Sequence, residues 1–83
     1  MTKTEILKSA LTSREEEILT YQINIDNYER AISKINADYS DNESMLEFRD
    51  RLAGMLSENK TEQLKSIIIR DVIADQLTEL EAS

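Results

Sequence analysis

The sequence predicts an all-α protein, a long helical hairpin that self-associates into a coiled coil or a four-helix bundle. Apolar residues recur at alternating spacings of three and four between residues 4 and 39, which is the pattern of a coiled-coil helix. Proline is absent and Gly54 is the only glycine among the 83 residues, so helix breakers are scarce. A stripe this narrow and this long must be covered by another helix. Residues 1–83 are therefore expected to form one helical domain.

The first helix is predicted over about residues 3–37. Thr2 and Glu5 form a capping box that places its start. Only Thr4 and Arg14 interrupt the apolar seam, so the pattern is sustained over nearly half of the chain. The seam consists of the a positions Thr4, Leu11, Ile18, Ile25, Ile32 and Tyr39 and the d positions Leu7, Arg14, Tyr21, Tyr28 and Ile35.

A turn is predicted over residues 38–42, where Asn, Asp and Ser side chains compete for backbone hydrogen bonds. Ser40 and Glu43 offer another capping box, which predicts that a second helix starts there. This helix is expected over about residues 43–57. Its three-four spacing is carried by Met45, Phe48, Leu52 and Met55.

A third helix is predicted over about residues 61–80. The register of the second helix falls on polar residues beyond Met55, so residues 57–62 form either a short turn or a stutter within one kinked helix. The third helix has a broad apolar face, which usually contacts more than one neighbour. We therefore take Ile69 and Ile73 as candidate contacts to a partner. The face consists of Leu64, Ile67, Ile68, Ile69, Val72, Ile73, Leu77 and Leu80.

The side chains offer little for catalysis or for holding a cofactor or a metal. Cysteine and histidine are absent, which removes the usual nucleophile, general base and transition-metal ligands. The acidic turn Asp38-x-Ser40-x-Asn42 departs from a calcium loop, because Glu43 stands where that loop needs glycine. We therefore expect a protein that is not an enzyme and that uses no cofactor or metal.

The chain is acidic, with 10 basic and 17 acidic side chains and a net charge of -7. Residues 1–38 carry a net charge of -2 and residues 39–83 a net charge of -5. Phosphate backbones repel such a chain, so its charge argues against nucleic-acid binding. The longest apolar run is Ile67-Ile68-Ile69, and the N-terminus lacks the apolar core of a secretory signal. We expect a soluble, cytoplasmic protein that binds no membrane.

Four seam residues are candidate contacts because aliphatic side chains are commoner at their positions. Arg14, at a d position, either fixes the register by pairing with Glu62 or an acid near the C-terminus, or reaches out to water. Tyr21, Tyr28 and Tyr39 are either core residues with the hydroxyl at the bundle edge, or anchors for another protein's helix in an open groove.

Leu19 and Ile23 form a candidate contact patch outside the seam. They occupy b and f positions four residues apart, so a simple two-helix hairpin leaves them in water. Isolated exposed aliphatic side chains are normal and need no function. If these two residues serve in binding, they face either the second protomer of a dimer or an outside partner.

These features predict a small interaction protein, namely an adaptor, assembly chaperone or inhibitor that docks apolar helix faces on another protein and forms a homodimer. Small chains of this kind are common among phage and mobile-element accessory proteins. The alternative is an acidic inhibitor that mimics nucleic acid and occupies a basic cleft of a DNA-handling protein. Strong loss of binding with salt would favour that alternative.

In outline, a short acidic helical hairpin is similar to the Rop-like plasmid RNA-binding proteins. It is also similar to the helical-hairpin co-chaperones of type III secretion needles. Both resemblances cover architecture only, since no sequence motif carries them. The first implies a third reading, which is RNA binding by a dimer of hairpins.

Overall fold

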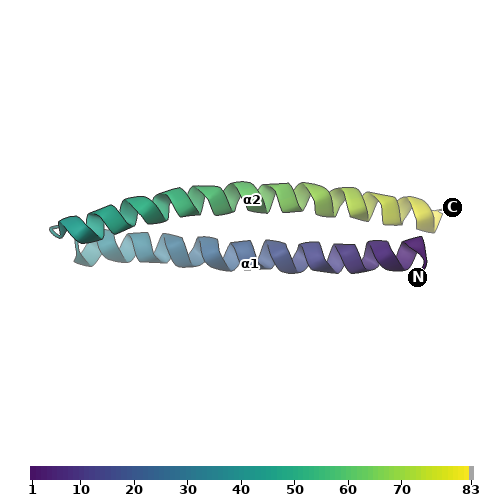
Figure 1. Cartoon of the computed structure of the whole chain (residues 1–83), viewed down its shortest axis with the longest axis horizontal. Helices are drawn as coiled ribbons and strands as arrows, with labels where there is room; N and C mark the ends of the chain where they lie inside the picture. The colour runs from purple at the N-terminus through teal and green to yellow at the C-terminus, as the bar shows by residue number, and fades with distance from the viewer. Residues whose placement is uncertain (83) are drawn as a thin grey trace.

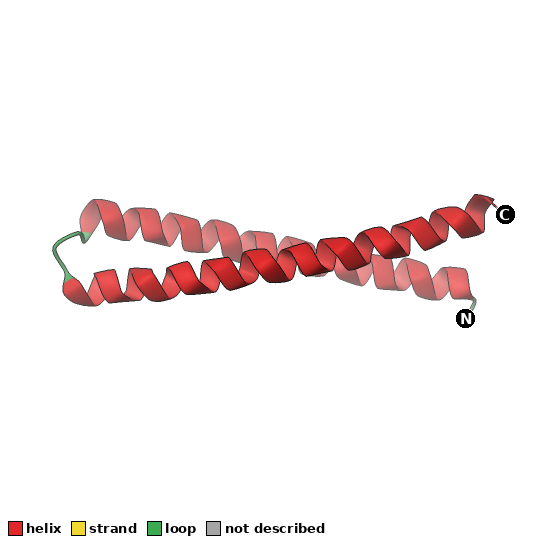
Figure 2. Cartoon of the chain, turned by 90° about the horizontal axis from the view of Figure 1, so that it is seen from above, coloured by secondary structure: helices red, strands yellow, loops and turns green. Residues whose placement is uncertain are grey.

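The computed structural model describes residues 1–82, which form two antiparallel helices joined by a short turn (Figure 1). Helix α1 spans Lys3–Asp38 and helix α2 spans Glu43–Ala82. The hairpin is a rod of 62 × 16 × 15 Å, with both ends of the chain at one end and the turn at the other. Seen from above, the helices cross at a shallow angle (Figure 2), as coiled-coil helices do. The prediction of an all-α helical hairpin is confirmed.

The start of α1 and the connection to α2 depend on side-chain caps. Thr2 caps α1 as predicted, since its Oγ1 accepts a hydrogen bond from the Glu5 backbone N–H at 3.2 Å. The predicted cap of α2 is wrong: Asn42 rather than Ser40 caps that helix. The Asn42 side-chain oxygen accepts from the Met45 N–H at 3.1 Å. Asparagine is as good an N-cap as serine, and Asn42 directly precedes the first residue of α2.

Helix α2 is continuous. Of the two alternatives for residues 57–62, a short turn between helices over 43–57 and 61–80 is therefore wrong, and one helix runs through these residues. Asn59 and Thr61 do not cap a new helix but bond back within the same one. The Asn59 Nδ2 donates to the carbonyl oxygen of Met55 at 2.8 Å, and the Thr61 hydroxyl donates to that of Ser57 at 3.2 Å. Because no proline or glycine interrupts residues 57–62, the helix continues through them.

The register of α2 differs from the one read from the sequence. Phe48 and Met55 were expected in the seam, but they are 40% and 43% exposed. Arg49 and Leu56 are half-buried instead. The residues of α2 that face α1 keep one unbroken three-four spacing along the whole helix. Polar residues therefore stand within one heptad series and do not end it. The series is Met45, Arg49, Leu52, Leu56, Asn59, Gln63, Ser66, Arg70, Ile73, Leu77 and Leu80.

The core is a thin line between the two helices. One of the expected contact candidates, Ile73, lies in it at 8% exposure and faces α1, so it is not available to a partner. Ser66 is the buried polar residue, at 3% exposure. The buried apolar residues are Ile25, Ile35, Leu52, Ile73 and Leu77. Within the described residues, neither helix has a stretch long and apolar enough to cross a membrane.

Candidate functional site

The two helices meet along two flanks, and one of them carries hydrogen bonds between glutamine side chains. Gln63 of α2 donates to the carbonyl oxygen of Ile18 at 3.3 Å and to the side-chain oxygen of Gln22 at 2.9 Å. Further along the same side, Lys60 pairs with Glu29 at 3.4 Å. We call this side of the hairpin the glutamine flank, after Gln22 and Gln63.

Two leucines straddle the hydrogen-bonded glutamines of this flank. Leu19 and Leu64 are each 60% exposed. Asn24 donates to Asn59 across the seam at 3.4 Å, so the antiparallel register places Leu19 level with Leu64. Leu64 also lines a shallow, open groove together with Gln22, Ile25, Glu29, Lys60 and Gln63.

The predicted exposure of the Leu19 and Ile23 pair therefore agrees with the structure. Ile23 is 52% exposed and lies further round, on the outward side of α1. Leu64 and Ile68 repeat the same b and f arrangement on α2, and Ile68 is 61% exposed. Sequence reasoning missed this matching pair, although residues 64–73 carry apolar side chains at six of the seven heptad positions. A helix that is apolar all round is usually covered on more than one side.

We call the opposite side the alanine flank, after Ala10 and Ala31 of α1. Both alanines are half-buried at g positions. The g positions of α2 on this flank hold Phe48, Met55 and Ile69, which are 40–43% exposed. Ile69, a predicted contact residue, is thus accessible here, unlike Ile73. Apolar groups therefore line both halves of this flank.

A polar cluster divides the alanine flank at its middle, and Glu17 is its centre. The Glu17 carboxylate accepts from the Arg14 guanidinium at 3.0 Å and from the Ser66 hydroxyl at 2.9 Å. Of the two roles expected for Arg14, pairing with Glu62 or an acid near the C-terminus is wrong, because its partner Glu17 lies on α1. Its side chain is 40% exposed, which agrees with the alternative that it reaches out to water. Glu17 lies one turn away on the same helix and is within reach without stretching the side chain. Glu62 pairs with Lys65 at 2.9 Å.

The three candidate tyrosines have different surroundings. Burial in the seam raises the pKa of Tyr21 above its ordinary value, because the phenolate loses hydration. The carboxylates of Glu17 and Glu62 and a hydrogen bond with Glu17 raise this pKa further, while Arg14 lowers it. Tyr28 is half-buried in the seam, and Tyr39 is 45% exposed at the turn.

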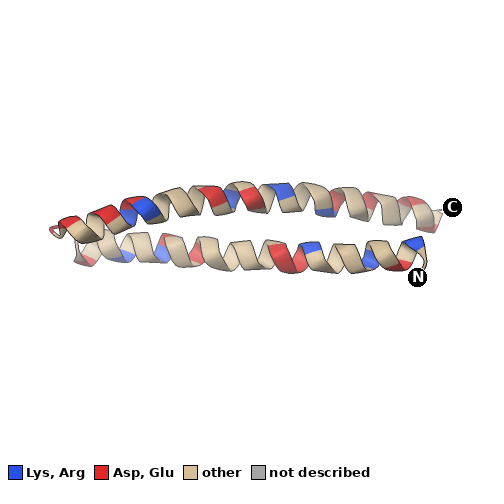
Figure 3. Cartoon of the chain, in the orientation of Figure 1, with Lys and Arg blue, Asp and Glu red and all other residues tan. Residues whose placement is uncertain are grey.

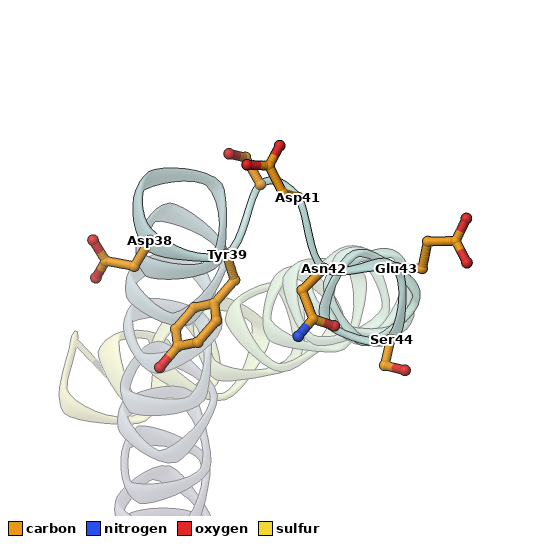
Figure 4. A pocket seen from close by; sticks show the side chains of 7 residues that line it. Asp38, Tyr39, Asp41, Asn42, Glu43 and Ser44 are labelled. Carbon is orange, nitrogen blue, oxygen red and sulfur yellow. The ribbon is translucent and has the colours of Figure 1, made fainter.

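The turn forms an open hollow lined by residues 38–44. In the close view, the carboxylates of Asp38, Asp41 and Glu43 point in three different directions (Figure 4). The Tyr39 ring and the Asn42 amide point back over the ends of the two helices instead. Within the described part of the chain, no three Asp or Glu residues are grouped so that they could hold a metal ion.

Charges of both signs are interspersed along most of the two helices, and the charged residues that follow Arg70 in α2 are all acidic (Figure 3). Within residues 1–82, five basic side chains pair with a carboxylate, and four of these pairs form within one helix. Asp26 with Arg30 and Glu47 with Arg51 are spaced i,i+4, but neither pair forms a salt bridge among the described residues. Asp26 accepts from Gln22 at 3.0 Å, and Arg51 lies over the Phe48 ring.

No family model matches the chain, and comparisons with curated proteins and with solved structures find no significant match. The function is therefore inferred from the two flanks.

Proposed function

We propose that this protein is a small non-enzymatic interaction protein that binds a helix of another protein on the glutamine flank. The exposure of Leu19 and Leu64, level with each other on that flank, carries the proposal. Burying a leucine side chain contributes roughly 1.5–3 kcal/mol, so this pair is a strong anchor. Docking of this kind is what an adaptor, an assembly chaperone or an inhibitor requires.

The groove fits an amphipathic helix better than an extended segment. Added strands need a free sheet edge, and the described residues form only helices and a turn. A partner helix laid between Leu19 and Leu64 would meet Gln22 and Gln63, which already bond to each other. These amides therefore lose little when they are covered.

The charged residues around the groove indicate which side chains the partner helix carries beside its apolar stripe. Glu15 and Glu16 lie one turn before Leu19 on the same side of α1. Lys60 is already paired with Glu29, which leaves the surroundings acidic. We therefore expect the partner helix to carry an apolar stripe bordered by Lys or Arg.

The test is affinity capture with the whole chain, comparing wild type with Leu19→Lys combined with Leu64→Lys. Wild type is expected to retain a protein partner through a high-salt wash, and the double variant is expected to lose it. Ile6→Lys is the matched control, because Ile6 is 52% exposed but lies outside this flank. Circular dichroism should show equal helix content in all three proteins.

Two outcomes would count against the proposal. Retention of the partner by the double variant would show that the leucines are not the anchor. Elution of the partner, or of nucleic acid, by salt alone would favour binding through charge, as in the nucleic-acid mimic or RNA-binding alternatives.

A further inference from the structure

We infer that the alanine flank is covered by a second copy of this chain, so that two hairpins form a four-helix bundle. This inference concerns the flank opposite to the one in the proposed function, and either can fail alone. It rests on the heptad pattern, the side-chain sizes and the charge pairing of that flank, together with the accessible area of the chain.

The heptad pattern distinguishes the two flanks on α1. Helices of a bundle carry apolar residues at a, d and either e or g, whereas a two-helix seam needs only a and d. Of the g positions of α1, Ala10, Glu17, Asn24 and Ala31 are half-buried, whereas Lys3 and Asp38 at the two ends of the helix are exposed. The e positions on the glutamine flank are all polar and exposed, namely Lys8, Glu15, Gln22, Glu29 and Asn36. On α1, apolar residues at these flanking positions are therefore found on the alanine flank alone, at Ala10 and Ala31. On α2 both flanks carry them, since the e positions on the glutamine flank include Leu46, Ala53, Ile67 and Ala74.

Side-chain sizes on the alanine flank are complementary between the two helices. The bond between Ser66 and Glu17 fixes the register, and on this register Ala31 lies level with the midpoint between Phe48 and Met55. A two-fold axis along the rod would place α1 of one copy over α2 of the other at the same level. The small side chain of Ala31 would then face the large ones of Phe48 and Met55, which is how bundle layers interdigitate.

The charged middle of the flank does not oppose such packing. Glu17 and Glu62 are each neutralised within their own chain, by Arg14 at 3.0 Å and by Lys65 at 2.9 Å. A covered carboxylate that keeps its partner avoids the large penalty of an isolated buried charge.

The accessible area also matches the expected interface. The chain exposes 6030 Å², whereas a compact monomer of 9.6 kDa exposes about 5,100 Å². The difference of about 900 Å² is spread over the whole rod, and it is large enough for the roughly 800 Å² that each partner contributes to a standard interface.

The first test measures the mass of the full chain in solution by sedimentation equilibrium. Wild type is expected at twice 9.6 kDa, and Met55→Glu combined with Ile69→Glu is expected at 9.6 kDa. Leu19→Glu combined with Leu64→Glu, on the glutamine flank, should remain dimeric. A wild type of 9.6 kDa at all concentrations would overturn the inference, and so would a dimer dissolved only by the glutamine-flank variant.

The second test does not depend on how the charged variants fold. The chain has no cysteine, so Ala31→Cys and Met55→Cys chains can be mixed and oxidised. A disulfide needs Cα atoms within about 7 Å, so the mixed disulfide should form in excess of its random share. The matched mixture of Asp26→Cys and Ser57→Cys on the other flank should not. Equal yields from both mixtures would contradict the proposed packing, whatever the partner experiment shows.

Discussion

Ser66 occupies a d position, where a coiled coil usually carries leucine or isoleucine, and it is only 3% exposed. Its hydroxyl donates to Glu17, and the neighbouring polar seam residues Asn59 and Gln63 also find partners on α1. Polar groups buried in a seam make a hairpin less stable than leucines at the same positions would. Their hydrogen bonds, however, can form in only one register of the two helices. The middle of this hairpin therefore fixes the alignment of the helices, while its two ends provide most of the apolar burial.

At the same scale, Tyr21 gives a prediction about pH. The pKa of Tyr21 is raised in the folded chain by burial and by Glu17 and Glu62, so the folded state keeps this proton where the unfolded state loses it. Its contribution to stability is complete below about pH 10 and is lost as the pH rises through the raised pKa. An absorbance titration of the tyrosines should show one late component, which Tyr21→Phe removes. Tyr39→Phe is the control and should leave that component in place. A titration unchanged by Tyr21→Phe would contradict this assignment.

At the scale of the elements, the sequence predicted α1 better than α2. The a and d positions of α1 are almost all apolar, so only one face of that helix can form the seam. In α2 two overlapping series share Met45 and Leu52, and the larger apolar residues Phe48 and Met55 favoured the wrong one. The correct series includes Arg49, whose role becomes clear only from its bond with Asn36 on α1. Such pairings across helices depend on tertiary contacts and leave no periodic signal within one helix.

Periodicity within one helix also does not predict which residues of the two helices lie together on a flank. The exposure of Leu19 and Ile23 was predictable from their heptad positions alone. That Leu64 lies level with Leu19 was not, because it requires the register between the two helices.

The start of α2 gives a prediction that separates the two candidate caps. Asn42→Ala should lower the free energy of unfolding by about 1 kcal/mol, because the Met45 N–H loses its acceptor. Ser40→Ala should change it by less than about 0.5 kcal/mol, since Ser40 lies outside the helix. Urea unfolding of both variants beside wild type measures the difference. A larger loss for Ser40→Ala would restore the capping box expected from the sequence.

At the scale of the whole molecule, the chain is far from spherical. Its radius of gyration is 18.4 Å, against about 12 Å for a compact domain of the same length. Elongation leaves a large share of each helix uncovered, which is why binding surfaces on both flanks are compatible with one short chain.

The shape predicts a small-angle scattering result. At high dilution the radius of gyration should be close to 18.4 Å. Side-by-side association through the alanine flank should double the mass with only a small rise in this radius, because the rod does not lengthen. End-to-end association would instead increase it strongly. A dilute value near 12 Å would show that the hairpin is not the solution conformation.

Both ends of the chain leave the rod at the same place, opposite the turn (Figure 1). A mechanical force applied between the two ends would therefore unzip the helices layer by layer and would not shear all layers at once. The layers at Leu77 and Ile73 would open first, and the layer at Ile35 and Leu52, next to the turn, would open last. Ser66 and its hydrogen-bonded neighbours stand between these apolar layers, with Ile25 as a buried apolar residue among them, so a pulling trace should show two resistant stretches separated by a weaker one.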